Sequence, residues 1–363
     1  MTFVSLFLQS DWPEAVSNSE DFFVGYRIGD TPTIWSTITS SFESKTSAIV
    51  LADHSLEKRS IILECFHQRW TFTSPTSVFP KIHPHSTLIY SINVTSDSSV
   101  IITGASDGDV RSSSALKGEP LKLYSGHVGD INSIAFIPKF KAILTAGSDY
   151  SCRFFDLVSG QLFAVFPHQS PVIKVLPSNN FDVAVSMCRN GAISVLDLIK
   201  KEITVGKSFE GAVDFCLLGN DEIVVLFSSK IVVVSVHDLE INKEIIIGLD
   251  VANLSSVVAL SESLVIIAGV QSFYCVLVSN GSVRCVSCPL DGRITNLKLS
   301  NDCIYAIIVD KVASFPVTVF ENSEINQITI YQGPSPHTSI MYDYSIGTKL
   351  WVSCNEGVLA FEV

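Results

Sequence analysis

The stretch AGSDYSCRFFDL, residues 146–157, contains the feature that decides the fold: a tight turn between two short apolar segments. Asp149 lies at the polar break, and Asp in such a place is typical of a turn that joins antiparallel strands. Another apolar segment precedes the stretch at 131–136, and a fourth follows it at 162–166. We therefore interpret residues 126–166 as four consecutive β-strands joined by short turns.

The same order of features recurs before and after this unit. Upstream, a strand pattern after His85 leads into VIITGASDG with a turn at Asp107; downstream, a pattern after His168 leads into VAVSMCRNG with Asn190 in the turn position. The first strands of successive units are predicted to begin near Leu88, Ile131, Val172, Val213, Val257, Ile294 and Ile340. Units of about forty residues have the length of four-stranded β-propeller blades. The sequence thus predicts an all-β, seven-bladed propeller.

The last unit needs a strand from another part of the chain. SIMYDYSIGTKLWVSCNEGVLAFEV, residues 339–363, holds three strands, which would leave the outer edge of this blade unpaired. The segment RWTFTSPTSVF, residues 69–79, stands just before the first blade and has strand character. We expect residues 69–79 to close the last blade, so that residues 69–363 form the propeller.

Residues 1–68 do not fit the repeat. SDWPEAVS reads as a short helix, with Asp11 as its N-cap and Pro13 in its first turn. Short alternating segments follow, DFFVGYRI, TIWSTI, AIVLAD and SIILECF, and each is typical of a strand. This part is expected to be an independent small β-rich domain or an elaborated edge of the propeller.

Composition narrows the possible partners. The formal net charge is −12, with 36 acidic against 24 basic residues, which disfavours nucleic acid and favours a basic protein partner. No apolar run reaches the roughly 18 residues of a membrane helix, and the first residues lack the basic start and small-residue cleavage site of a signal peptide. Nine cysteines scattered along the chain fit a reducing compartment. The sequence therefore predicts a soluble intracellular protein.

The repeated units resemble the WD-repeat family of seven-bladed propellers. In that family a His before the first strand, a Ser or Thr on the second strand and an Asp in the next turn share buried hydrogen bonds with a Trp. The matching sets are His85, Thr103 and Asp107; His127, Thr145 and Asp149; and His168, Ser186 and Asn190. The Trp position holds Phe155 in the second blade and Leu196 in the third, so the repeats depart from the family pattern there.

The amino-terminal segment resembles that of a more specific family. LQSDWPEAV followed by FFVGYRIGDTPTIWSTIT is similar to the opening of the proteasomal ATPase-associated factor family, in which such a segment precedes a seven-bladed propeller. The first two blades and the ending SCNEGVLAFEV also match. The resemblance implies a non-enzymatic, monomeric assembly chaperone of the proteasome regulatory particle in the cytoplasm and nucleus. It would bind the carboxy-terminal small domain of one base ATPase subunit.

Candidate partner-binding residues come from one face of the predicted ring. That face is made by the loops that lead into the first strands and the turns that join the second strands to the third. Its acids without a His in register are Asp130, Glu210, Asp291, Asp310 and Glu356, which we expect to form an acidic surface for a basic partner. For any one of these acids, the alternative is that it is an ordinary solvated surface residue without a role in binding. Tyr150 is a candidate aromatic anchor, with a packing role as the alternative.

Other motifs in the sequence do not indicate a metal, phosphate-binding or catalytic site. Cys285 and Cys288 form a lone Cys-x-x-Cys without a second pair, and His83 and His85 lack a third ligand. The chain contains neither a Gly-rich phosphate loop before a helix nor a nucleophile elbow. We therefore expect no catalytic residue, metal or cofactor.

Two alternative functions stay open from the residues alone. The first is a generic WD-repeat scaffold in another multiprotein complex, such as one in ribosome biogenesis. The second is a propeller hydrolase, which would need convergent catalytic groups at the central channel, and the sequence shows none.

Overall fold

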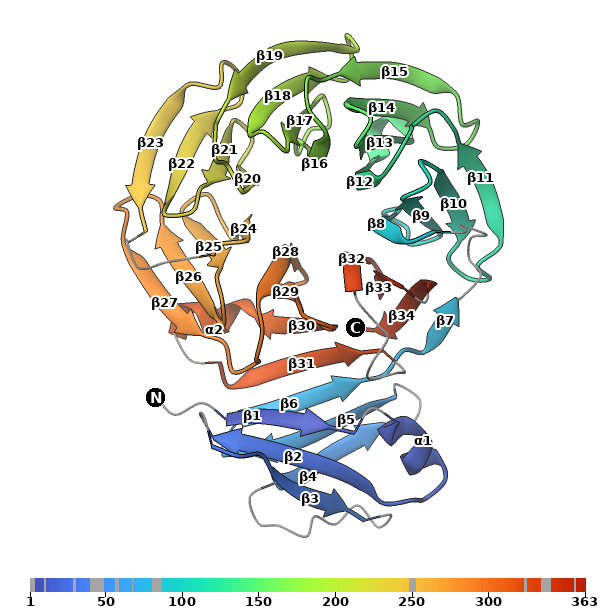
Figure 1. Cartoon of the computed structure of the whole chain (residues 1–363), viewed down its shortest axis with the longest axis vertical. Helices are drawn as coiled ribbons and strands as arrows, with labels where there is room; N and C mark the ends of the chain where they lie inside the picture. Colours follow the sequence, from blue (N-terminus) through green and yellow to red (C-terminus); the bar gives the residue numbers. More distant parts are fainter. Residues whose placement is uncertain are drawn as a thin grey trace.

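The computed structural model shows a ring of β-sheets around a central channel, with a smaller N-terminal module on the outside of the ring (Figure 1). It describes residues 4–9, 11–28, 31–39, 49–55, 59–66, 68–79, 87–247, 253–322, 325–333, 341–355 and 357–363.

Blades 1 to 3 each consist of four antiparallel strands in chain order from the channel outwards. Blade 1 holds β8 (Ile89–Val94), β9 (Val100–Ala105), β10 (Val110–Ser114) and β11 (Pro120–Tyr124). Blade 2 holds β12 (Ile131–Ile137), β13 (Ala142–Gly147), β14 (Ser151–Asp156) and β15 (Leu162–Pro167), with a single 3₁₀ turn at Pro138–Phe140. Blade 3 holds β16 (Val172–Pro177), β17 (Val183–Cys188), β18 (Ala192–Asp197) and β19 (Glu202–Ser208).

Blades 4 to 7 repeat this arrangement. Blade 4 holds β20 (Asp214–Leu218), β21 (Glu222–Leu226), β22 (Lys230–Ser235) and β23 (Ile241–Ile246), and blade 5 holds β24 (Ser256–Ala259), β25 (Leu264–Ala268), β26 (Ser272–Leu277) and β27 (Val283–Ser287). Blade 6 holds β28 (Ile294–Ser300), β29 (Cys303–Ile308), β30 (Lys311–Pro316), the short helix α2 (Val317–Asn322) and β31 (Gln327–Gln332). Blade 7 holds β32 (Met341–Ile346), β33 (Lys349–Cys354) and β34 (Gly357–Glu362).

The seven-bladed, all-β prediction is confirmed. Within the described residues, the innermost strand of each of the first six blades begins within one residue of its predicted start. The seventh predicted start, Ile340, lies outside the described residues, and β32 begins at Met341. Two six-residue helices are present, and no helix in the described ranges is long and apolar enough to cross a membrane.

The burial pattern explains the two kinds of strand in each blade. All six residues of β13 are buried, because neighbouring blades cover both faces of the middle strands. The outer strand β19 instead alternates between exposed and half-buried residues, since one of its faces meets water.

Blade 7 is completed by β7 (Ser77–Phe79), which pairs antiparallel with β34. The preceding strand, β6 (Gln68–Thr73), pairs in parallel with β31 of blade 6. The expectation that residues 69–79 form one closing strand is thus corrected. Pro75 lies between the two pairings, and a proline cannot donate to a β-ladder, so the segment divides there.

The N-terminal module consists of two small sheets. The first contains β1 (Val4–Leu8), β2 (Phe22–Ile28) and β3 (Ile34–Ile38), with α1 (Trp12–Ser17) between β1 and β2. The second contains β4 (Ile49–Ser55) and β5 (Ser60–Cys65). β5 pairs with β6 and β4 pairs with β5, so the two strands extend blade 6 to a seven-stranded sheet. The sequence pattern predicted α1 and the later strands but not β1.

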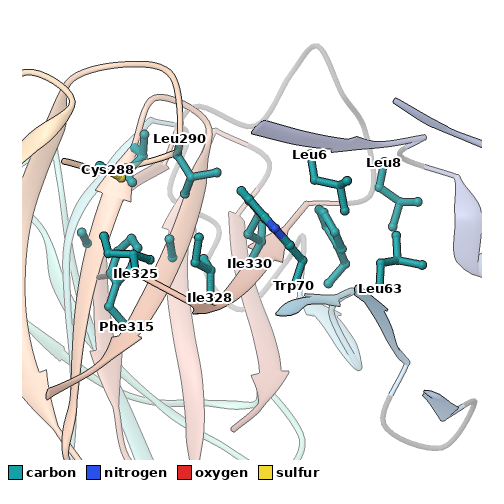
Figure 2. Packing of buried hydrophobic residues seen from close by; sticks show 14 of the residues in the cluster. Leu6, Leu8, Leu63, Trp70, Cys288, Leu290, Phe315, Ile325, Ile328 and Ile330 are labelled. Atoms are coloured by element: carbon teal, nitrogen blue, oxygen red, sulfur yellow. The ribbon is translucent and has the colours of Figure 1, made fainter. Parts of the chain in front are cut away.

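The module and the ring share one hydrophobic core. Figure 2 shows Trp70 between Ile330 of blade 6 and the side chains of Leu6 and Leu63 in the module. Outside this core, Ser5 Oγ donates to the Pro289 carbonyl of the ring at 2.7 Å. Of the two arrangements expected for residues 1–68, the structure shows an elaborated edge of blade 6.

Candidate functional site

The innermost strands of all blades run in the same direction, so equivalent loops gather at the same end of the ring. We call one end the top face: it carries the loops that lead into the innermost strands and the turns that join second and third strands. The other end, with the remaining turns, is the bottom face. The five candidate partner-binding residues that the structure describes belong to segments of the top face: Asp130, Tyr150, Glu210, Asp291 and Asp310.

His127 joins the loop into blade 2 to the turn that holds Asp149. Its Nδ1 lies 2.9 Å from the Asp149 carboxylate, and its Nε2 lies 2.8 Å from Thr145 Oγ1. Burial lowers the pKa of His127 below its ordinary 6.5, even though Asp149 acts to raise it. The ring is therefore neutral, with Nδ1–H donating to the carboxylate and Nε2 accepting from the threonine hydroxyl.

Asp149 stays ionised in this arrangement. Burial acts to raise the pKa of its carboxyl, but hydrogen bonds from His127, Ser151 and the Val128 amide outweigh burial and lower it. Arg153 lies 3.5 Å away on the other side. Asp149 is thus a structural acid that fixes the loop at Val128, and it is not free to meet a partner.

The other two predicted sets differ from this one. His168 Nε2 lies 2.8 Å from Ser186 Oγ, but its Nδ1 lies 2.9 Å from the carbonyl of Phe166 instead of contacting Asn190. Asn190 Oδ1 accepts from the Ala192 amide within its own turn. In the first set, His85 lies outside the described residues, and buried Thr103 Oγ1 has no hydrogen-bond partner among the described ones.

We expect the free energy of unfolding to fall as the pH drops below 6.5. Burial lowers the pKa of His127 and of His168, so below 6.5 the unfolded chain binds more protons than the folded one, and stability rises with pH in this window. Each histidine contributes up to about 1.4 kcal/mol per pH unit. Urea unfolding at about pH 7.5 and about pH 5.5 measures the difference. Equal midpoints would contradict the neutral state of these rings.

The top face of blade 2 presents two exposed apolar side chains beside an acid. Val128 is 78% exposed and Tyr150 is 52% exposed, and they belong to the loop and the turn that Asp149 ties together. Tyr150 has φ 65°, a left-handed conformation that a tyrosine rarely adopts. Half-buried Asp130 stands in the same loop, and its carbonyl accepts from the Ser148 amide at 2.8 Å. We call Val128, Asp130 and Tyr150 the blade 2 patch.

The remaining candidate acids that the structure describes differ in their surroundings. Glu210 is exposed, and its backbone lies against Gly191 in the turn of blade 3. Asp291 forms an ion pair with Arg27 of the module, and its other partner is Gln271. The structure therefore corrects the expectation that Asp291 is available to a basic partner.

Asp310 and Glu356 are the two remaining candidate acids. Asp310 is half exposed, and its carboxylate lies 3.9 Å from Lys311 Nζ. Glu356 lies outside the described residues. The top face thus has mixed charge. Among the residues that the structure describes there, Val128 is the most exposed large apolar side chain, and it was not identified from the sequence.

The central channel has a volume of about 680 Å³ and is lined by the innermost strands. Side chains on these strands bond to the next blade at every junction of the ring. In order from the junction of blades 1 and 2 to the junction of blades 7 and 1, the side chains that donate or accept these bonds are Ser91, Asn132, Lys174, Asp214, Ser256, Asn296 and Asp343. We call this ring of hydrogen bonds the channel belt.

Asp343 closes the channel belt between blades 6, 7 and 1. Its Oδ1 accepts from Asn296 Nδ2 at 2.8 Å and from Lys298 Nζ at 2.6 Å, and its Oδ2 accepts from the Ile92 amide at 3.1 Å. Asp214 has the same role between blades 3, 4 and 5, with Lys174 at 2.6 Å. The charged groups of the channel are thus engaged in holding blades together.

The cysteine motif is not arranged as a metal site. Cys285 is exposed on β27, whereas Cys288 is buried, and burial raises the pKa of the Cys288 thiol to about 12. Within the described residues, no group of three or more His, Cys, Asp or Glu side chains is placed to hold a metal ion.

Comparison with known proteins finds repeats and relatives. The family model "WD domain, G-beta repeat" matches residues 75–112 and 118–156. The chain is 27% identical over 143 residues to proteasomal ATPase-associated factor 1 of Gallus gallus, which covers 37% of this chain and 36% of the relative. For the Homo sapiens protein of the same name the identity is 24% over 140 residues, covering 36% and 35%. The matched segment thus spans about a third of the length of these relatives.

Two other similarities concern the repeats and the fold. A guanine nucleotide-binding protein subunit beta of Oryza sativa subsp. japonica is 34% identical over 92 residues, which cover 25% of this chain and 24% of that protein. Among solved structures, the computationally designed protein Ika8 superposes with a TM-score of 0.58 at 14% identity, covering 77% of this chain and 97% of that one. This second likeness supports the fold alone.

Proposed function

We propose that this chain, a WD-repeat β-propeller protein similar in sequence to the proteasomal ATPase-associated factors, is a non-enzymatic assembly factor of the proteasome regulatory particle. In this proposal it binds the carboxy-terminal small domain of a base ATPase subunit, in the cytoplasm and nucleus, and acts as a monomer. The observation that carries the proposal is the similarity over 143 residues to proteasomal ATPase-associated factor 1.

The blade 2 patch is the part of the top face best suited to hold such a partner. An aromatic and an aliphatic side chain that are both more than half exposed supply apolar area, and Asp130 beside them supplies a carboxylate for a Lys or Arg of the partner. Glu210 adds a second exposed acid on the same face. Because other acids of the face are paired, we expect association to depend only modestly on salt.

The channel supports a binding function over a catalytic one. Asp343 and Asp214 each accept several hydrogen bonds from neighbouring blades, and each is paired with a lysine. A general base or nucleophile needs a lone pair that is free to act on substrate. These carboxylates are occupied with holding the blades together, so the most polar site of the ring is structural in this proposal.

Replacing Tyr150 with alanine is expected to weaken binding of the ATPase small domain at least tenfold, and Asp130→Asn severalfold, since anchors at an interface centre carry most of its energy. Isothermal titration of the full chain against the isolated small domain of each base ATPase measures both. The matched control is Phe23→Ala, because Phe23 is 53% exposed on the module, close to the exposure of Tyr150.

The outcomes separate the binding surface from the function. If no small domain binds the wild-type chain, the proposed function is wrong. If one binds and Tyr150→Ala leaves its affinity unchanged, the function stands but the blade 2 patch is not its surface.

A generic scaffold in another complex is the second candidate, and the similarity to a guanine nucleotide-binding protein subunit beta favours it. Affinity purification distinguishes the two. Under our proposal, base ATPase subunits co-elute while mature proteasome is largely absent; recovery of an unrelated complex, such as ribosome precursors, would favour the scaffold. Deleting residues 1–68 is a poor test, because the deletion removes β4 and β5 and uncovers Trp70.

A further inference from the structure

The bottom face carries a repeated turn whose most exposed residue varies from blade to blade. In five blades the turn between third and fourth strands has one form, in which a backbone amide donates to the carbonyl of the last residue of the third strand. These donor–acceptor pairs are Gly118–Ser114, Gly160–Asp156, Lys201–Asp197, Leu239–Ser235 and Gly281–Leu277. Each donor residue has a positive φ, so the backbone geometry is shared.

The second residue of this turn is aliphatic in three consecutive blades. Leu116 is 84% exposed, Val158 is 75% exposed and Ile199 is 60% exposed. The equivalent residues of blades 4 and 5 are His237 and Ser279. The turn therefore accepts a polar residue at this position, and turn geometry does not explain three aliphatic ones.

Lysines accompany these aliphatic side chains. Lys117 follows Leu116, and Lys200 and Lys201 follow Ile199, and all three are exposed. Lys200 lies 3.5 Å from Asp197 but keeps 65% of its side chain exposed. In blade 4 the residue equivalent to Lys117 and Lys200 is Asp238.

The turns of blades 1 to 3 are at the same end of three consecutive blades, and contacts join each of these blades to the next. Tyr124 on the outer strand of blade 1 donates its hydroxyl to the Leu157 carbonyl in the turn of blade 2. Lys201 Nζ, in the turn of blade 3, lies 5.0 Å from the ring centre of Phe163 on the outer strand of blade 2. Leu116, Val158, Ile199, Lys117, Lys200 and Lys201 thus follow one another along the rim, and we call them the bottom arc.

We propose that the bottom arc is a docking surface for an acidic segment of a partner protein that carries aliphatic side chains. Three solvent-exposed aliphatic residues at equivalent places of consecutive blades offer apolar side chains to a partner. The lysines select acidic character, and their methylene stems extend the apolar area. The chain as a whole has a net charge of −12, so it repels an acidic segment elsewhere and directs it to this arc. The arc lies on the opposite face from the blade 2 patch, and its role is independent of the function proposed above.

The test uses the full chain and fluorescein-labelled peptides of glutamate with leucine at every fourth position. Fluorescence anisotropy is expected to give a Kd on the order of 10–100 μM. Two control peptides carry lysine in place of every glutamate, or serine in place of every leucine. Each is expected to bind at least tenfold more weakly.

The protein variants copy residues that the fold already accepts in blade 5. The triple variant Leu116→Ser, Val158→Ser and Ile199→Ser follows Ser279, and the double variant Lys117→Asn and Lys200→Asn follows Asn280. The triple variant is expected to weaken binding at least tenfold, and the double variant severalfold with a smaller salt dependence. Ile246→Ser is the matched control, since Ile246 is equally exposed on an outer strand away from the arc, and it should bind as wild type.

Four results would overturn the proposal. The leucine-free peptide could bind as well as the leucine peptide, or the triple variant could bind as wild type. Sedimentation could show a dimer of this chain that the triple variant loses, which would make a second copy the occupant. Vesicles of phosphatidylserine and phosphatidylcholine could bind the chain through the arc while the peptide does not, which would make a membrane the occupant.

Discussion

Replacing Asp343 with alanine is expected to lower the free energy of unfolding by about 3 kcal/mol. The carboxylate accepts from Asn296, Lys298 and the Ile92 amide, and the change leaves these three donors without it. Lys298 would then be a charge in the channel wall without its acid, which costs more than the lost hydrogen bonds alone. Urea unfolding followed by circular dichroism measures the change.

Two further variants test the explanation. Asp343→Asn keeps an acceptor for the Ile92 amide and loses only the charge that Lys298 needs, so a smaller loss of about 1–2 kcal/mol is expected. Asp310→Ala removes an acid on the top face that lies 3.9 Å from Lys311 Nζ, and it should change stability by less than about 0.5 kcal/mol. Equal effects of Asp343→Ala and Asp310→Ala would show that the channel belt does not hold the ring closed.

Replacing Trp70 with alanine is expected to cost about 3–5 kcal/mol. The side chain is fully buried where the module meets blade 6, and its removal leaves a cavity among Leu6, Leu63 and Ile330 (Figure 2). Trp70→Phe is expected to cost only about 1 kcal/mol, because the buried Nε1 of Trp70 has no hydrogen-bond partner among the described residues. Trp35→Ala, at an exposed site of the same module, is the control.

The same experiment tests whether the module and the ring unfold together. Because they share a core and a seven-stranded sheet, we expect a single transition for wild type and for Trp70→Ala. A separate transition at lower urea, in which the module unfolds while the ring persists, would contradict the shared core.

Local patterns were sufficient to predict the ring. Turn residues between apolar runs, such as Asp149, mark hairpins directly, so blade number and strand starts follow from the sequence. The division of residues 69–79 between two blades could not be predicted from strand character alone, because their partners lie far away in the chain. Pro75 was the available signal.

The candidate site was harder to predict because it depends on pairing between distant residues. Asp291 was expected to be available until the structure placed Arg27 beside it, and the two are far apart in sequence. The channel belt had a visible signal that was missed: a polar residue is the third residue of several innermost strands, as at Ser91, Asn296 and Asp343. Val128 and Leu116 gave no signal, since exposure depends on the folded surface.

The pairing of β7 with β34 has a consequence for how the protein folds during its synthesis on the ribosome. Phe79 is synthesised early but pairs with Val358, and at about 5–20 residues per second the wait between them is roughly 15–60 s. During that time the nascent chain holds a growing row of blades whose two ends cannot meet. The short length of β7, three residues, gives a stray strand little to pair with while it waits. The pairing of β7 with β34, which closes the ring, is therefore expected to follow translation of blade 7, as the last step of maturation.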